Sequence, residues 1–178
     1  MRISSQGADR ARFVALSGAF LCAALMLTLA ENLAFPAGLL PIPGAKIGLA
    51  NSAILLCTAT LGRAPAFAVS MARVLLMFIL FGNGSSAIYS LSGALLSFIG
   101  IAFLINNRHL SFIGKSVISA VLHNIAQVIC ASAIIGEDVM LIMPVMVLTA
   151  LGAGVLTGII INLIFDKVRK MLYRGTHA

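Results

Sequence analysis

Arg73 is the residue whose position in this sequence most strongly suggests binding chemistry. It lies about halfway along the apolar run Ala64–Gly82, and no Asp or Glu lies in the middle of any apolar run. A charged side chain inside a membrane costs about 3 kcal/mol or more unless it is paired or solvated. Two interpretations follow. The guanidinium binds an anionic group of a ligand, or it is structural and is held by helix carbonyls or by Glu31.

A second group of polar side chains lies in the apolar run Lys115–Ile135. His123 and Gln127 are four residues apart, and Asn124 and Gln127 are three apart, so in a helix they occupy neighbouring surface positions. Such a polar stripe either lines a ligand site or makes hydrogen bonds between membrane helices. We expect it to line a site, because the stripe is dense and includes a titratable imidazole.

The segment Phe35–Lys46 differs from the other connections. It is long, contains three Pro and two Gly, and carries one charged residue, Lys46. Proline limits the chain entropy that is lost when such a segment becomes ordered. We predict a lid over the outer end of the protein, with Lys46 and Asn51 facing the same cavity. The alternative is an ordinary loop at the membrane interface.

The sequence lacks the motifs that would indicate catalysis. It has no D-D-x-x-D cluster for magnesium and diphosphate, no G-x-x-x-x-G-K-[ST] nucleotide loop and no G-x-S-x-G nucleophile turn. Cys22, Cys57 and Cys130 form no C-x-x-C pair and have no histidine at ligand spacing, so we expect packing residues. We predict a protein that is not an enzyme and has no cofactor. Any ATP-driven process would need the nucleotide site of a partner.

The composition indicates that these side chains belong to a membrane protein. Hydrophobic residues make up 61% of the 178 residues, charged residues only 10%, and the mean hydropathy is +1.10. A soluble domain carries about 25% charged residues, because its surface faces water. Twelve basic and five acidic residues are too few for such a surface, so most of the surface must face lipid.

We predict an all-α integral membrane protein, a bundle of six transmembrane helices forming a single transmembrane domain over residues 1–178. A spanning helix needs about 20 largely apolar residues. The runs that approach or exceed this length are Arg12–Phe35, Ile47–Leu61, Ala64–Gly82, Ser85–Ile105, Lys115–Ile135 and Val139–Phe165. The second run is short and the last is long. The first run is longer than the apolar core of a signal peptide, so we expect it to be retained.

The positions of Lys and Arg predict that both termini are cytoplasmic. In this orientation the inner segments hold ten basic residues, which are Arg2, Arg10, Arg12, Arg63, Arg108, Lys115, Lys167, Arg169, Lys170 and Arg174. The outer loops hold Lys46 alone, together with Glu31, Glu137 and Asp138. Such a bias sets the orientation of membrane proteins and accounts for the net charge of +7. We therefore exclude nucleic-acid binding and expect a multi-pass protein in contact with the lipid of a bacterial plasma membrane.

Small residues recur at helical spacing in two of the runs. Ala15, Ala19 and Ala23 lie along one face of the first run, and Gly154 and Gly158 are four residues apart in the last. In lipid, helices associate through close packing, which small residues permit. Packing inside the bundle is the simplest interpretation, but the face on the first helix is also long enough to dock another membrane subunit.

Four motifs follow one another along nearly the whole chain. They are Pro43–Asn51, Arg73, Ser92–Ser97 and His123-Asn124-x-x-Gln127. In this order they resemble the Gx transporter family, often labelled heptaprenyl diphosphate synthase component I. That family is similar to the substrate-binding S-components of energy-coupling factor (ECF) importers.

The resemblance implies a six-helix subunit that captures a vitamin or other small molecule and works with a transmembrane T-component and two ATPase subunits. The face formed by Ala15, Ala19 and Ala23 is similar to the A-x-x-x-A surface by which S-components dock on the T-component. No particular substrate is implied, because S-components share the scaffold and differ in the pocket. The expected substrate-binding residues are His123, Asn124, Gln127, Arg73, Lys46, Asn51 and Tyr89.

Two other functions stay open at this point. The family label suggests a non-catalytic membrane accessory subunit of isoprenoid or quinone synthesis, although the sequence has no aspartates arranged to bind diphosphate. A free-standing channel or carrier is the third interpretation, and it would transport its substrate without any partner.

Overall fold

A computed structural model describes residues 3–34, 48–81 and 84–173, and every regular element in these ranges is a helix. The elements are α1 (Ile3–Ala34), α2 (Asn51–Leu61), α3 (Arg63–Phe81), α4 (Gly84–Leu104), α5 (Phe112–Ile135), the 3-10 helix η1 (Glu137–Ile142) and α6 (Met143–Tyr173). Five helical segments are long and apolar enough to cross a membrane. This supports the predicted all-α membrane bundle.

The short second helix departs from the predicted set of six spans. α2 has 11 residues and begins at Asn51, not at Ile47. Its length is about 16 Å, which is roughly half of the 30 Å of hydrocarbon in a bilayer. The sixfold crossing of the membrane therefore stays a prediction.

Two helices extend well beyond the predicted ends of their runs. α1 begins at Ile3 instead of Arg12, and α6 continues to Tyr173 instead of ending at Phe165. Both extensions are polar or basic stretches without proline, and Lys, Arg and Gln are good helix formers. The apolar pattern marks the part of a helix that suits lipid, whereas the helix itself continues until its backbone is interrupted.

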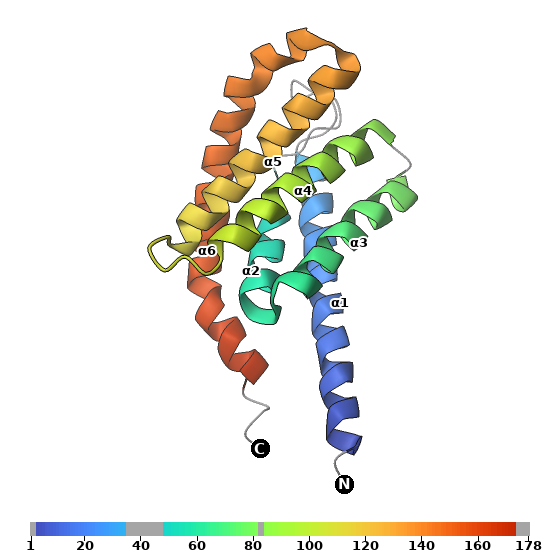
Figure 1. The fold of residues 1–178 in the computed structure, drawn as a ribbon, viewed down its shortest axis with the longest axis vertical. Helices are drawn as coiled ribbons and strands as arrows, with labels where there is room; N and C mark the ends of the chain where they lie inside the picture. The colour runs from blue at the N-terminus through green and yellow to red at the C-terminus, as the bar shows by residue number, and fades with distance from the viewer. Residues whose placement is uncertain (1–2, 35–47, 82–83, 174–178) are drawn as a thin grey trace.

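Figure 1 shows both termini at one end of the molecule and η1 at the other. α5 lies between α4 and α6 and packs extensively on both. Within the described residues, α1 contacts α2 and α3 but not α6. The bundle is therefore open along the side between α1 and α6.

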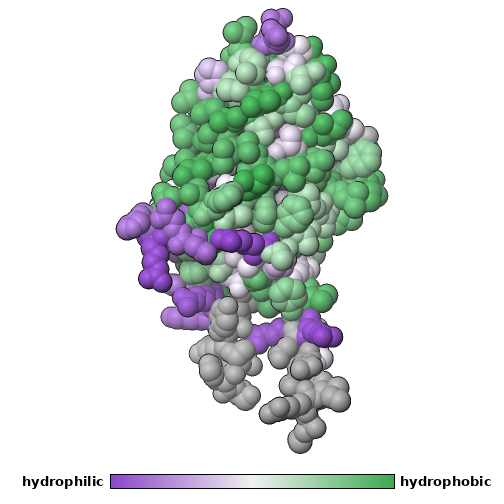
Figure 2. All heavy atoms as spheres, viewed as in Figure 1, coloured by the Kyte–Doolittle hydropathy of each residue, from purple (hydrophilic) through white to green (hydrophobic). Residues whose placement is uncertain are grey.

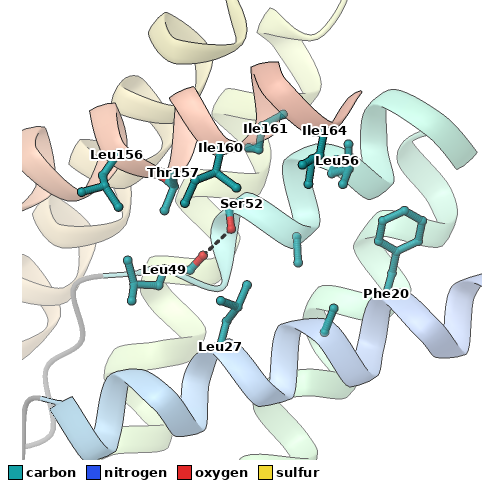
Figure 3. A pocket seen from close by; sticks show the side chains of 12 residues that line it. Phe20, Leu27, Leu49, Ser52, Leu56, Leu156, Thr157, Ile160, Ile161 and Ile164 are labelled. Carbon is teal, nitrogen blue, oxygen red and sulfur yellow. Dashed lines mark hydrogen bonds between the residues drawn. The ribbon is translucent and has the colours of Figure 1, made fainter. Parts of the chain in front are cut away.

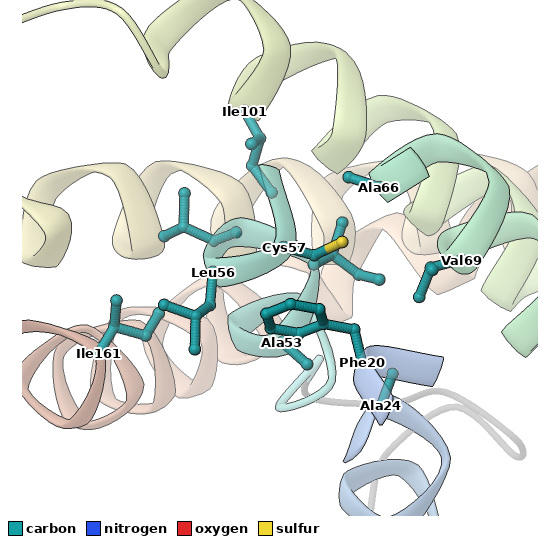
Figure 4. Packing of buried hydrophobic residues seen from close by; sticks show 11 residues of the cluster. Phe20, Ala24, Ala53, Leu56, Cys57, Ala66, Val69, Ile101 and Ile161 are labelled. Atoms are coloured by element: carbon teal, nitrogen blue, oxygen red, sulfur yellow. The ribbon is translucent and has the colours of Figure 1, made fainter. Parts of the chain in front are cut away.

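α2 is the centre of the hydrophobic core. It contacts each of the other five α-helices, and every residue from Ala53 to Thr58 is buried. Figure 4 shows Leu56 and Cys57 of this helix surrounded by apolar side chains such as Phe20 and Val69. A helix that is apolar on all sides is stable when it is covered on all sides. The shortness of α2 is thus compatible with its place inside the bundle.

α5 and α6 approach each other closely at two glycines. A Cβ atom on Gly154 would lie 2.6 Å from Val117 Cα, and one on Gly158 would lie 2.5 Å from Ile113 Cα. Beside them, the hydroxyl groups of Ser116 and Thr157 are 2.9 Å apart and share a hydrogen bond. The glycine pair therefore serves packing within the bundle, which was the simplest interpretation of this motif.

The outer surface is that of a protein in lipid. Leu33, Phe103 and Leu141 are each more than 80% exposed, and many other large apolar side chains are exposed as well. Figure 2 shows an apolar body with hydrophilic residues gathered toward the end where the termini lie. An apolar surface of this extent is not stable in water. The side of the membrane that this end faces stays a prediction from the charge pattern.

Candidate functional site

Glu31 anchors the beginning of α2 to α1. Its carboxylate accepts hydrogen bonds from the backbone N–H groups of Gly48 (2.7 Å) and Leu49 (3.1 Å), and the side chain is 2% exposed. The N–H groups at the start of a helix have no partner within the helix, and a negative charge there is favourable. This contact fixes the chain just before α2, next to the segment 35–47.

Arg73 lies inside the bundle near this anchor. It is 3% exposed, and the carboxylate of Glu31 attracts its guanidinium electrostatically. Its Nε and Nη2 atoms are buried and have no hydrogen-bond partner among the described residues. Glu31 thus contributes the neighbouring charge that the structural interpretation of Arg73 requires. The hydrogen-bonding capacity of the guanidinium is nevertheless not used up within the described part of the chain.

His123 and Gln127 form a hydrogen-bonded pair in the middle of α5. Their Nε2 atoms are 2.7 Å apart, and both side chains are almost fully buried. The four-residue spacing therefore places the two side chains together, as predicted from the sequence.

The imidazole of His123 packs against two glycines of other segments. A Cβ atom on Gly93 of α4 would lie between 2.6 and 2.9 Å from three ring atoms of His123. Gly48, which has a φ of 94°, lies against the same ring and against the side-chain amide of Asn51. Asn51, Gly93 and His123 are thus brought together from α2, α4 and α5. We refer to Glu31, Gly48, Asn51, Arg73, Gly93, His123 and Gln127 as the polar cluster.

Replacement of Gly93 by Ala should destabilise the protein by about 1–3 kcal/mol, because the new methyl group overlaps the imidazole ring of His123. Thermal unfolding of the purified protein measures this effect. Gly18→Ala is the control, because Gly18 lies in α1 with no atom within 4 Å of its Cβ position. In the His123→Ala background the cost of Gly93→Ala should largely disappear. An equal cost in both backgrounds would show that the ring is not the obstacle.

Asn124 of α5 contacts α6, and Tyr89 of α4 packs in a cluster with residues of α5 and α6. The amide nitrogen of Asn124 donates to the carbonyl of Met146 in α6 (2.7 Å), whereas its Oδ1 has no hydrogen-bond partner among the described residues. Tyr89 is 2% exposed and packs in an apolar cluster with Val128 and Met146. The predicted polar stripe is therefore divided, since Asn124 makes the hydrogen bond between helices that was the alternative interpretation.

One predicted site residue is not described by the structure, and three residues near the candidate site were not predicted from the sequence. Lys46 and the predicted lid Phe35–Lys46 lie outside the described residues. Gly48, Gly93 and Ser90 were not predicted as site residues, and Ser90 has a buried hydroxyl with no hydrogen-bond partner in the described part of the chain. Gly48 and Gly93 do fall within two of the four sequence motifs, which is the signal that points to them.

An apolar groove opens beside this cluster, between α1, α2 and α6. Its volume is about 260 Å³, and nearly all of its lining is hydrocarbon. Figure 3 shows Phe20 and Leu27 on α1 facing Ile160 and Ile164 on α6, with Leu56 of α2 between the two helices. The groove occupies the side of the bundle where α1 and α6 do not meet.

The small-residue face of α1 is uncovered. Ala15, Ala19 and Ala23 are all exposed, and Ala23 also lines the groove. Packing inside the bundle therefore does not explain this face in the described structure. It is continuous with the groove and forms a smooth apolar surface.

Metal and disulfide chemistry has no candidate group in the described residues. No set of three or more His, Cys, Asp or Glu side chains in these ranges lies close enough to hold a metal ion. Cys22, Cys57 and Cys130 are free thiols.

The fold and the site define a helical membrane protein with a polar cluster inside and a smooth apolar face outside. The chain belongs to the heptaprenyl diphosphate synthase component I family, whose model matches residues 20–164. The resemblance read from the four sequence motifs is thereby confirmed. A search of curated proteins and a search of solved structures each gave no match.

Proposed function

We propose that this protein is the substrate-binding subunit of an ATP-driven ECF-type importer for a vitamin or other small molecule. The observation that carries the proposal is the polar cluster. Arg73 and Asn51 each bury side-chain nitrogens that have no hydrogen-bond partner among the described residues. Buried polar groups of this kind are expensive in a membrane and typically mark a substrate site.

The uncovered face of α1 supports the part of this proposal that requires a membrane-embedded partner subunit. Close approach of two helices in lipid requires small residues, and Ala15, Ala19 and Ala23 supply them at four-residue spacing. The partner would be a transmembrane T-component. Two ATPase subunits would provide the energy, because the chain has no nucleotide-binding loop of its own.

The printed name of the family favours a second candidate, a non-catalytic accessory subunit of heptaprenyl diphosphate synthesis. The apolar groove between α1 and α6 suits a prenyl chain by its lining. In this case the partner would be a soluble prenyltransferase. The polar cluster would then have no evident ligand, so we rank this candidate second.

Replacement of Ala19 by Leu tests the proposal through the partner. A bulky side chain on the docking face should reduce co-purification of a T-component and ATPases from the native membrane by about 10-fold or more. Val14→Leu is the control, because Val14 is also exposed on α1 but lies about 140° around the helix from Ala19.

Each outcome of this purification separates the candidates. Loss of T-component and ATPases with Ala19→Leu, and not with Val14→Leu, supports the importer subunit. A soluble prenyltransferase in place of these partners supports the accessory subunit. Transport by the protein alone in liposomes would indicate a free-standing carrier and would contradict both.

A further inference from the structure

We infer that Arg73 is the receptor for a single carboxylate group of the substrate, which it holds side-on through Nε–H and Nη2–H. The inference rests on the proposed function and narrows its substrate to small carboxylic acids. Three features of the described residues carry it: the geometry of the guanidinium, the balance of charge around it, and the neutral donors beside it.

The two nitrogens of Arg73 without hydrogen-bond partners are a matched pair. Nε and Nη2 lie on the same edge of the guanidinium plane, and their N–H bonds point in nearly the same direction. This edge fits the two oxygens of a carboxylate in a bidentate arrangement. Both atoms are buried, and neither has a hydrogen-bond partner among the described residues. An arginine held in place by helix carbonyls would have used this edge for the fold.

The charge near Arg73 favours a ligand with one negative charge. Glu31 is close enough to act on the guanidinium electrostatically, and its two oxygens accept the N–H groups of Gly48 and Leu49. Arg73 is the one Arg or Lys in the polar cluster, as its residues were named above. A phosphate ester would place up to two further negative charges beside Glu31 in a medium of low dielectric constant, where like charges repel strongly.

Neutral donors of the same cluster can serve the rest of such a molecule. Glu31 binds Gly48, and Gly48 lies against the side-chain amide of Asn51, so the Asn51 amide belongs to the surroundings of the anchor. Asn51 Nδ2 is buried without a hydrogen-bond partner among the described residues. An amide donor in the same cluster as a carboxylate receptor fits an acid that also carries a carbonyl, ether or ring-nitrogen acceptor.

The experiment uses the smallest probe of each kind. Purified full-length protein in detergent is heated with acetate, with its neutral isostere acetamide, or with methyl phosphate. In the Cys22→Ser, Cys130→Ser background a thiol-reactive dye reports unfolding, because the remaining Cys57 is fully buried and the chain contains no Trp. The midpoint temperature of unfolding, measured at increasing probe concentrations, gives the affinity of the protein for each probe.

The informative variants are Arg73→Lys and Arg73→Gln. Arg73→Lys keeps the positive charge but loses the two parallel N–H donors of the guanidinium edge. Arg63→Lys and Arg63→Gln are the matched controls, because Arg63 is exposed at the start of the same helix. We expect acetate, and not acetamide, to stabilise the unchanged protein and both Arg63 variants. Affinity for acetate should fall about 10- to 100-fold with Arg73→Lys, as expected for loss of a charge-assisted bidentate contact.

Three results would overturn the inference: equal effects of acetate and acetamide, unchanged acetate affinity in Arg73→Lys, or stronger stabilisation by methyl phosphate than by acetate. If Arg73→Gln does not fold, Arg73→Lys still decides, because the buried positive charge next to Glu31 is retained. The importer proposal is tested separately by the co-purifying subunits. Recovery of a T-component without acetate-specific stabilisation would therefore remove the carboxylate receptor alone.

Discussion

Replacement of Glu31 by Gln is expected to destabilise the protein by about 3–5 kcal/mol, the cost of removing one partner from a buried pair of charges. The reason is that one carboxylate has two structural tasks. It accepts the backbone N–H groups of Gly48 and Leu49, and it is the negative charge that attracts the buried guanidinium of Arg73. Removing one partner from a buried pair of charges leaves the other uncompensated.

Thermal or denaturant unfolding in detergent measures the effect of Glu31→Gln. Glu137→Gln is the matched control, because Glu137 is exposed in η1 and should change stability by no more than about 0.5 kcal/mol. The double variant Glu31→Gln with Arg73→Gln should be more stable than Glu31→Gln alone, since the orphaned charge is gone. If Glu31→Gln unfolds at the same midpoint as Glu137→Gln, the anchor does not have the role assigned to it.

The sequence was sufficient to predict what depends on composition and local spacing. Long apolar runs predicted six membrane spans, and the structure contains five helices that are long and apolar enough to cross a membrane. The four-residue spacing predicted that His123 and Gln127 would meet, and their Nε2 atoms are 2.7 Å apart. Both predictions work because lipid selects apolar length and because a helix fixes the angle between neighbouring residues.

Contacts between segments that are distant in the sequence could not be predicted from composition and local spacing. The bond from Gly48 to Glu31 joins residues that are 17 apart in the sequence, and the contact of Gly93 with His123 joins α4 to α5. The sequence offered Glu31 as one of two kinds of partner for Arg73, but nothing in it indicated that the same carboxylate anchors α2. Periodicity predicts which residues share one face of a helix. Which residues of the neighbouring helices contact that face depends on how the whole bundle is packed.

The second apolar run shows what hydropathy alone leaves open. The run Ile47–Leu61 was predicted as a short span, and its residues 51–61 form an 11-residue helix that the other helices cover. An all-round apolar helix suits either lipid or a protein interior, and hydropathy does not distinguish the two environments. A helix of about 16 Å covers roughly half of the hydrocarbon thickness of a bilayer, so a crossing at this run stays a prediction.

Asn124 shows a related limit at the candidate site. Its spacing from Gln127 predicted a shared surface, yet its amide donates to Met146 of the neighbouring helix. Two residues that are three or four positions apart lie near each other on the surface of a helix, but their side chains can still contact different neighbouring helices. The assignment of a polar residue to a ligand site therefore depends on which helix stands opposite, and this was known only from the structure.

Replacement of Gly158 by Ala should destabilise the protein by about 1–3 kcal/mol, and replacement by Leu should prevent stable folding in detergent. A Cβ atom at this position would lie 2.5 Å from Ile113 Cα, which is backbone. A flexible side chain can turn aside, but a backbone atom moves only with its helix. The added methyl group therefore has to separate α6 from α5.

Gly152 provides the matched control for this prediction. It lies in the same helix, is exposed, and has no atom within 4 Å of its Cβ position. Gly152→Ala should therefore stabilise the protein by about 0.5–1 kcal/mol, because alanine restricts the unfolded chain and favours helix. Equal unfolding midpoints for Gly152→Ala and Gly158→Ala would contradict the close packing of α5 on α6.

The hydroxyl pair in the same seam gives a further test of the mechanism. Ser116 and Thr157 share a hydrogen bond of 2.9 Å, which requires the two helices to stay in contact beside Gly158. Ser116→Ala alone should cost about 0.6 kcal/mol, the average measured for hydrogen bonds between membrane helices. Combined with Gly158→Ala it should cost almost nothing more, because the separation of the helices has already broken the bond. Full additivity would instead place the strain of Gly158→Ala within α6, and not between α5 and α6.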